Sequence, residues 1–244
     1  PDLIVMHGDN LDLPEMGKYR LSPAFQRTTQ SSIDYATTMV ARLRDAAPEA
    51  RIVWLAGNHE ERLVNYIIDN AVAAFGLRRG NVPSEWPVMS VPFLCRFDDY
   101  GIEYIPGYPA GYFWINEKLK VIHGTRVKSS GSTAHLYLSN EKTSVLYGHI
   151  HRREWAELTR DDYDGPKTIL AASAGCLARV DGVVPSTKGG IDLNGRPVTA
   201  TENWQQGLCV VTYQDGDNPF HLEMVPIRDS VMFYRGKIWG KNVE

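Results

Sequence analysis

The segment Ile52–Glu60 reads Ile-Val-Trp-Leu-Ala-Gly-Asn-His-Glu, and its two halves differ in character. Five apolar residues are followed at once by glycine, asparagine, histidine and glutamate. A short, continuous apolar run is typical of a strand that is covered on both faces of a sheet. Because the run ends in a glycine, the chain can turn sharply there and present polar side chains at the end of the strand. We therefore predict a buried strand whose carboxyl end is followed by polar side chains that could bind a ligand or take part in a reaction.

Apolar runs of the same kind occur at three more places where a polar turn follows. Leu3–Met6 runs into His-Gly-Asp, Leu119–Ile122 runs into His-Gly, and Val145–Tyr147 runs into Gly-His-Ile-His. We predict each of these runs to be a strand. Further β-rich runs, also predicted as strands, are Ile169–Ala172, Leu208–Tyr213 and Leu222–Val225.

Helices are predicted between and after the first two strands. Apolar residues recur at helical spacing across Ser32–Ala47. A second helix is predicted to open at Asn58 or His59 and to continue to Ala71. Alternation of strand, helix and strand indicates an α/β protein with right-handed crossovers.

The remaining segments are less regular in sequence. Residues 78–114 hold five prolines and many aromatic residues, and we expect an irregular insertion over one end of the sheet. Asp161–Gly165 and Gly182–Gly195 are expected to be long exposed loops, and residues 232–239 are predicted to form a hairpin. No repeat or linker is visible, so one domain over residues 1–244 is preferred.

The composition is that of a globular protein. The 244 residues are 43% hydrophobic and 23% charged, which excludes collagen, intrinsic disorder and a disulfide-stapled miniprotein. With 26 Lys and Arg against 29 Asp and Glu, the net charge is -3, so duplex binding driven by bulk charge is not suggested, although a local basic groove stays open. The three cysteines form no Cys-x-x-Cys pair and favour a reducing compartment. No membrane span or signal peptide is visible.

Side chains that bind metals stand at the ends of four predicted strands. They are Asp9, Asn58, His123 and the pair His149 and His151. Ligands bind at the carboxyl ends of strands in open α/β sheets, so these side chains are expected to converge. Imidazole with carboxylate and amide oxygen suits a first-row dication such as Mn, Fe or Zn. Each signal alone also fits an ordinary turn, a satisfied histidine or a helix cap at Asn58; their joint occurrence in this order argues against coincidence.

The chain resembles the calcineurin-like metallophosphoesterase superfamily in four motifs that follow the family's order. They are Gly-Asp-Asn-Leu-Asp at residues 8–12, Gly-Asn-His-Glu at 57–60, His-Gly at 123–124 and Gly-His-Ile-His at 148–151. The resemblance implies an α/β sandwich of two mixed β-sheets flanked by helices, and a metal-dependent phosphoesterase. The family's Asp-x-His motif is absent from this chain. We expect the strand that carries it to precede Pro1 in the natural protein; a true loss is the less favoured alternative.

The resemblance also implies a role for each ligand. Asp9 would bridge two divalent ions, of which Mn is favoured over Fe and Zn. The shell of one ion would be completed by Asn58, His123 and His149. The other ion would keep only Asp9 and His151, because Asp-x-His supplies its remaining ligands. One of the two metal sites is therefore expected to be incomplete in this chain.

Residues beside these ligands are assigned smaller roles. In the family the histidine equivalent to His59 is not a ligand; it contacts the phosphate or protonates the leaving oxygen, so His59 is the predicted catalytic residue. Asp12 is expected to orient a loop or a histidine rather than to bind metal. Arg62 and Arg152 are predicted to bind substrate. A solvated helix arginine fits Arg62 equally well, and a solvated basic pair is slightly favoured for Arg152 and Arg153.

The predicted function is hydrolysis of a phosphodiester by a hydroxide that two metal ions activate. A nucleic acid or a nucleotide is the first substrate expected. A phosphomonoesterase, including a phosphoprotein phosphatase, is the runner-up, and a non-catalytic scaffold that has lost one metal site is the alternative from another class. The sequence favours a microbial or phage cytoplasmic hydrolase without a membrane partner, and it does not indicate an oligomeric state.

Overall fold

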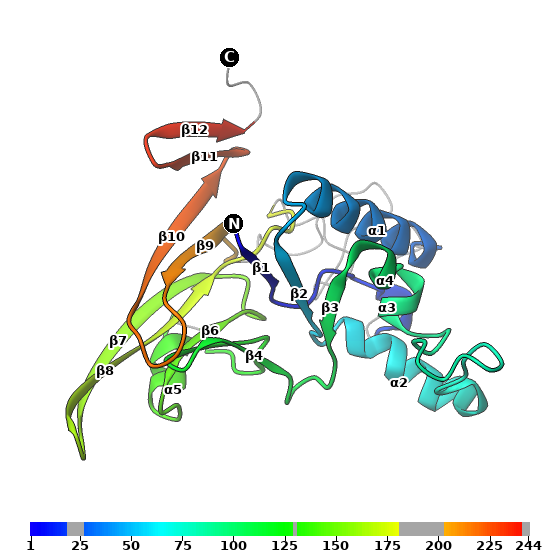
Figure 1. Ribbon diagram of the computed structural model, residues 1–244, viewed down its shortest axis with the longest axis horizontal. Helices are drawn as coiled ribbons and strands as arrows, with labels where there is room; N and C mark the ends of the chain where they lie inside the picture. The colour runs from blue at the N-terminus through cyan, green and yellow to red at the C-terminus, as the bar shows by residue number, and fades with distance from the viewer. Residues whose placement is uncertain (19–26, 129–130, 181–202, 241–244) are drawn as a thin grey trace. The chain divides into compact units, whose positions relative to one another are not determined.

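The computed structural model describes residues 1–18, 27–128, 131–180 and 203–240. Strands alternate with helices in the first part of the chain and dominate the second part (Figure 1), which confirms the predicted α/β class. The chain divides into two compact units: the first unit covers Pro1–Gly111, and the second unit includes the described residues from Tyr112 onward. Among the described residues, no helix has both the length and the apolar character needed to span a membrane.

The first unit is built on a three-stranded parallel sheet. Its strands are β1 (Leu3–Met6), β2 (Arg51–Leu55) and β3 (Ile102–Ile105), in the order β1-β2-β3. Four of the five residues of the central strand β2 are buried, as an unbroken apolar run requires. The register pairs Met6 with Trp54, so the carboxyl ends of β1 and β2 lie side by side.

The two long helices of the first unit follow the predicted positions. Helix α1 (Thr29–Ala46) begins at Thr29 rather than Ser32, and α2 (Glu60–Ala71) begins after the Gly-Asn-His turn. Each buries one apolar stripe, which includes Val40 in α1 and Leu63 in α2. The short helices are η1 (Pro14–Met16), η3 (Val72–Ala74), α3 (Val91–Leu94) and α4 (Phe97–Tyr100).

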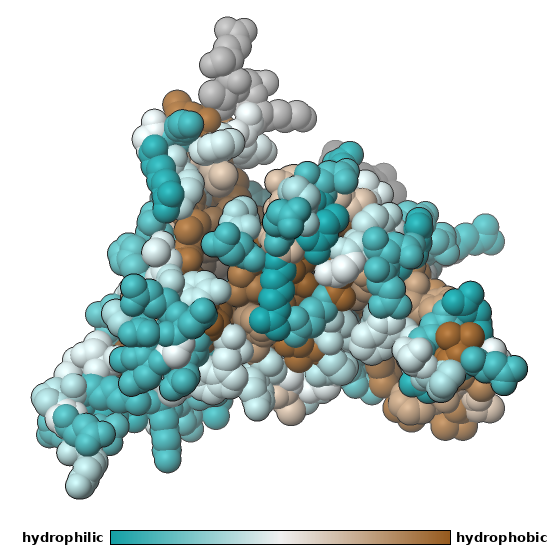
Figure 2. Space-filling view, in the orientation of Figure 1, coloured by the Kyte–Doolittle hydropathy of each residue, from teal (hydrophilic) through white to brown (hydrophobic). Residues whose placement is uncertain are grey.

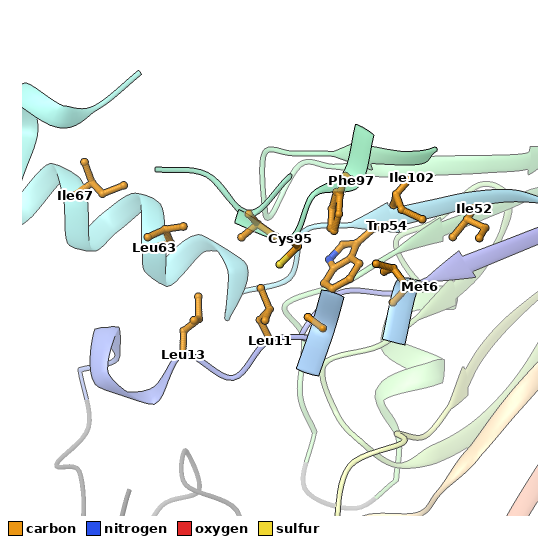
Figure 3. Packing of buried hydrophobic residues seen from close by; sticks show 13 residues of the cluster. Met6, Leu11, Leu13, Ile52, Trp54, Leu63, Ile67, Cys95, Phe97 and Ile102 are labelled. Atoms are coloured by element: carbon orange, nitrogen blue, oxygen red, sulfur yellow. The ribbon is translucent and has the colours of Figure 1, made fainter. Parts of the chain in front are cut away.

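Trp54 is the largest fully buried side chain of the first unit's core (Figure 3). Its ring centroid lies 4.8 Å from that of Phe97 in α4, and the two planes are tilted by 43°. Cys95, also fully buried, belongs to the same cluster. A buried tryptophan removes roughly 150–250 Å² from water. Trp54 therefore anchors the central strand against the segment that contains α3 and α4.

Residues 78–114 differ from the predicted irregular insertion. They contain α3, α4, β3 and the first residues of β4 (Tyr112–Asn116). Strand β3 pairs in parallel with β2, with Ile102 opposite Ile52, so this segment supplies the third strand of the sheet. The apolar pattern of β3 is short and is interrupted by Glu103. Pairing with the buried strand β2, rather than a strong local pattern, decides its conformation.

The second unit contains two sheets. A mixed sheet has the order β4-β5-β6-β8-β7, in which β5 (Leu119–Ile122) and β6 (Ser144–Tyr147) are parallel neighbours. An antiparallel sheet has the order β12-β11-β10-β9. The other elements are α5 (Thr133–Leu138), β7 (Arg153–Asp162), β8 (Gly165–Ala174), β9 (Gly207–Tyr213), β10 (Phe220–Arg228), β11 (Val231–Tyr234) and β12 (Lys237–Gly240).

The number of sheets differs from the predicted two mixed sheets. The described residues form three sheets, one parallel, one antiparallel and one mixed, because apolar runs locate strands without identifying their partners. Asp161–Gly165, predicted to be a long loop, is a tight connection in which Asp162 of β7 pairs with Gly165 of β8. The predicted hairpin over residues 232–239 is confirmed as β11–β12. The loop predicted at Gly182–Gly195 lies outside the described residues.

Candidate metal centre

Asp9 and Asn58 stand after neighbouring parallel strands of the first unit. Asp9 follows β1 and Asn58 follows β2, so strand pairing places both turns at one edge of the sheet. The backbone after β1 is left-handed at Gly8 (φ 91°) and at Asp9 (φ 56°). The Asp9 side chain is 9% exposed, and its Oδ1 accepts the backbone N–H of His59 at 2.9 Å. The two turns are therefore bonded to each other through the Asp9 carboxylate.

Glu60 holds both turns from inside the first unit, where it is 1% exposed. Its Oε2 accepts the backbone N–H groups of Asp9 and Gly57, each at 2.8 Å. Its Oε1 accepts the backbone N–H of Asn10 at 2.9 Å and the indole N–H of Trp54 at 3.1 Å. Four donors thus converge on one buried carboxylate. Glu60 fixes the backbone on both sides of Asp9 together with the start of the second turn.

Burial raises the pKa of Glu60, and the negative charge of Asp9 raises it further, while three backbone N–H donors oppose the rise. Glu60 was not predicted to be a functional residue from the sequence. A signal was available, because Glu60, Leu63 and Ile67 recur at helical spacing and all three are buried. A carboxylate on the apolar stripe of a helix needs internal partners, since burying it unpaired is costly.

His59 lies between two carboxylates of the first unit. Its Nδ1 is 3.0 Å from Oδ1 of Asp12, and its Nε2 is 3.7 Å from Oδ2 of Asp9. The His59 side chain is 15% exposed and makes no capping hydrogen bond to α2. Helix capping therefore does not explain a histidine at this position. Asp12 contacts a histidine, as predicted. The two ring nitrogens therefore face different carboxylates, Nδ1 that of Asp12 and Nε2 that of Asp9.

Arg62 contacts Asp12 and is largely buried. Its Nη1 lies 3.2 Å from Oδ1 of Asp12 and also donates to the backbone carbonyl of that residue, and the arginine side chain is 12% exposed. The alternative of a solvated helix arginine is therefore wrong, while substrate binding by Arg62 stays a prediction. The ion pair orders the carboxylate that faces His59.

His123 and His149 are neighbours in the second unit. They follow β5 and β6, which pair in parallel with Ile122 opposite Tyr147. The backbone N–H of Gly148 donates to the carbonyl of His123 at 2.9 Å. The two imidazole centroids are 5.4 Å apart, with an angle of 73° between the planes, and His123 is 3% exposed. Strand pairing therefore brings the two imidazoles together, as their positions at strand ends predicted.

Gly124 allows the chain to turn directly after His123. Its φ is 87°, and a Cβ at this position would clash with the hydroxyl oxygen of Tyr137 in α5. The same hydroxyl accepts the backbone N–H groups of Thr125 at 3.2 Å and Arg126 at 3.4 Å. A glycine is needed for this close approach, which fixes the loop that leaves the histidine.

His151 and Arg152 also make contacts within the second unit. The His151 ring lies 4.2 Å from the Trp204 ring, nearly perpendicular to it at 81°. Arg152 is 12% exposed; its Nε is 3.1 Å from Oε1 of Glu154, and its Nη2 donates to the carbonyl of Lys128 at 2.6 Å. Arg152 is therefore held by protein groups rather than solvated, which differs from the solvated basic pair favoured from the sequence. Substrate binding by Arg152 stays a prediction.

One carboxylate and two imidazoles form the candidate metal centre. Among the described residues, Asp9, His123 and His149 make a group that could hold a metal ion. His123 is buried and the other two residues are half-buried. The donor set fits a first-row dication, because imidazole nitrogen and carboxylate oxygen are common ligands of such ions. His151 is not part of this group, and Asn58 stays a predicted ligand.

Comparisons with known proteins give no relative from which a family could be assigned. No protein-family model matches the chain, and neither the curated proteins nor the solved structures give a match. The resemblance to calcineurin-like metallophosphoesterases therefore rests on the four motifs of the sequence.

Proposed function

We propose that this chain is a metal-dependent phosphoesterase that hydrolyses phosphodiesters, with a nucleic acid or a nucleotide as its substrate. The observation that carries the proposal is the grouping of Asp9, His123 and His149 as potential metal donors. All three follow strands, at the positions where the family's motifs stand in the sequence. A calcineurin-like sandwich is part of the same proposal.

The donors suit a first-row divalent ion, and Mn is favoured over Fe and Zn. Asp9 offers two oxygens and can bridge two ions, whereas each imidazole offers one nitrogen. Asn58 and His151 would add further ligands, and the second site would stay incomplete within this chain. When bound, such ions neutralise phosphoryl oxygens and lower the pKa of a bound water toward neutrality.

His59 is proposed to protonate the leaving oxygen or to contact the phosphoryl group. Asp12 holds its Nδ1 at 3.0 Å, so the ring is oriented before substrate binds. Arg62 in turn holds Asp12 at 3.2 Å. A general acid in such a position contributes about 10²–10⁴-fold to the rate. Glu60 is not proposed to touch metal or substrate; it is a positioning residue that holds the turn that carries Asp9.

Hydrolysis of bis(4-nitrophenyl) phosphate and of 4-nitrophenyl phosphate in the presence of Mn²⁺, by the protein with its natural N-terminus, tests the proposal. Turnover of the diester should be the faster, and His149→Ala should abolish it because the substitution removes a direct ligand. His221→Ala is the matched control, since His221 is an exposed histidine on β10. Its replacement should leave turnover unchanged.

The other outcomes separate the alternatives. Preferential hydrolysis of the monoester would favour a phosphomonoesterase. Metal binding without hydrolysis of either ester, by the protein with its natural N-terminus, would favour a non-catalytic scaffold. Diester turnover that survives in His149→Ala would contradict the proposed centre.

A further inference from the structure

The β11–β12 hairpin ends the antiparallel sheet of the second unit. Strand β12 is the edge of that sheet, and all four of its residues are exposed. The register pairs Met232 with Trp239 and Phe233 with Ile238. Because successive residues of a strand point to opposite faces, these two pairs lie on opposite faces of the hairpin. The hairpin therefore presents side chains to its surroundings from both faces.

Large apolar side chains are exposed on both of these faces. Phe233 is 71% exposed, and Ile238 and Trp239 are each 48% exposed. Figure 2 shows hydrophobic side chains beside hydrophilic ones at this end of the second unit. Exposed apolar patches of this kind mark interaction surfaces more often than scattered single residues do.

The charges on the hairpin point to an anionic partner. Arg235 and Lys237 are exposed at its turn, and residues 231–240 contain no acidic residue. The charges of Arg228 and Asp229, which precede the hairpin, cancel each other. The hairpin thus carries a local charge of +2, whereas the whole chain has a net charge of -3. The positive charge of the hairpin complements the negative charge of a phosphate backbone.

The turn also displays an arginine at a position that usually takes another residue. Arg235 and Gly236 form the two-residue turn, with φ values of 49° and 72°. Turns of this type favour Asn-Gly, because both central residues need a positive φ. The Arg235 guanidinium lies 5.2 Å from the centroid of the Tyr234 ring. A cation is thereby presented beside an aromatic ring.

We propose that the β11–β12 hairpin binds single-stranded nucleic acid. Aromatic side chains stack on unpaired bases regardless of sequence, and neighbouring cations follow the phosphates. Phe233 and Trp239 would supply the stacking surfaces, and Arg235 and Lys237 would contact phosphates. The inference deepens the proposed function and rests on it, because it names single-stranded nucleic acid as the substrate class that the hairpin recruits.

Fluorescence anisotropy of a labelled oligothymidylate, titrated with the full chain, measures this binding. Trp239→Ala and Phe233→Ala should each weaken binding by about 5- to 150-fold, the loss expected for one base stack. Phe233 is 71% exposed and Trp239 is 48% exposed, so the melting temperature should fall only slightly, by the loss of one cross-strand contact in each variant. The double variant Arg235→Ala/Lys237→Ala should weaken binding and reduce the slope of log K against log salt by about 1.4, since each phosphate contact contributes about 0.7.

Tyr163→Ala is the matched control. Tyr163 is 99% exposed at the tip of the β7–β8 hairpin, but its neighbours in sequence are Asp161, Asp162 and Asp164. It is an aromatic residue at a hairpin tip with the opposite charge around it. Its replacement should leave the affinity for the oligonucleotide unchanged.

Turnover of bis(4-nitrophenyl) phosphate, measured on the protein with its natural N-terminus, separates this inference from the proposed function. The hairpin variants should retain it, because so small a diester does not need the hairpin. Retained turnover with no oligonucleotide binding, or with binding that Trp239→Ala leaves unchanged, would overturn the hairpin inference alone. If the protein is a dimer that binds no oligonucleotide, and Trp239→Ala dissociates this dimer, the hairpin inference is overturned in favour of pairing between edge strands of two copies. Oligonucleotide binding through the hairpin without hydrolysis of any ester would support the hairpin inference and contradict the enzymatic proposal.

Discussion

Replacing Glu60 by glutamine tests whether this carboxylate holds the turns of the first unit. The side chain keeps its size, but one oxygen becomes an NH₂ group. Each Glu60 oxygen accepts two N–H donors, so in either orientation one buried and one partly buried donor lose their acceptor and face another donor. A buried donor without a partner costs about 1–3 kcal/mol, so two cost about 2–6 kcal/mol. At about 2–4 °C per kcal/mol for a chain of this size, Tm should fall by at least about 4 °C.

Differential scanning calorimetry measures this fall, and Glu61→Gln is its matched control. That substitution makes the same chemical change at the next residue of α2, outside the cluster of four donors. Metal affinity of Glu60→Gln should fall as well, because the turn that carries Asp9 loses its support. The loss of an outer partner typically costs about 10–100-fold in affinity. A Glu60→Gln protein with the wild-type Tm and metal affinity would refute the reasoning.

Three further predictions concern the thiols, the proposed acid and a glycine. Burial raises the pKa of Cys95 and of Cys209 to about 12. At pH 8 only about one thiol in ten thousand is therefore ionised. Iodoacetamide should modify these two cysteines only after the protein is unfolded, and mass spectrometry measures the modification. His59→Ala should lower kcat by about 10²–10⁴-fold at near wild-type metal occupancy, and a smaller defect on an activated aryl ester would identify proton donation. Gly124→Ala should lower the free energy of unfolding by about 1–3 kcal/mol, because its Cβ would meet the Tyr137 hydroxyl; an unchanged urea midpoint would contradict that contact.

Strands with a strong local signal could be predicted to the residue. β1 and β5 occupy Leu3–Met6 and Leu119–Ile122 as predicted, because short runs rich in apolar and β-branched residues, each ending at a polar turn, mark strands. β7 was missed, since only two residues of Arg153–Asp162 are buried and its conformation depends on pairing with β8. β3 was missed for the same reason. The partners of each strand, and hence the three sheets, depend on contacts that a single sequence does not reveal.

The ends of the strands were the most predictable part of the candidate centre. His123 and His149 follow strands that pair in parallel, so their positions in the sequence already placed them together. The supporting contacts could not be predicted, because they join residues far apart in the chain. Glu60 bonds to the backbone of Asp9 across a separation of 51 residues, and Arg152 reaches the carbonyl of Lys128 across 24. Such partners are set by packing rather than by local pattern.

Isothermal titration of the chain with Mn²⁺, compared with its His149→Ala and His221→Ala variants, tests the candidate metal centre most directly. The wild-type chain and His221→Ala should bind with the same affinity. His149→Ala should bind more than about a hundredfold more weakly, beyond the 10–100-fold typical of losing an outer partner, because it removes a direct ligand. Equal affinity of all three proteins, or no binding by any of them, would contradict a metal centre built on Asp9, His123 and His149.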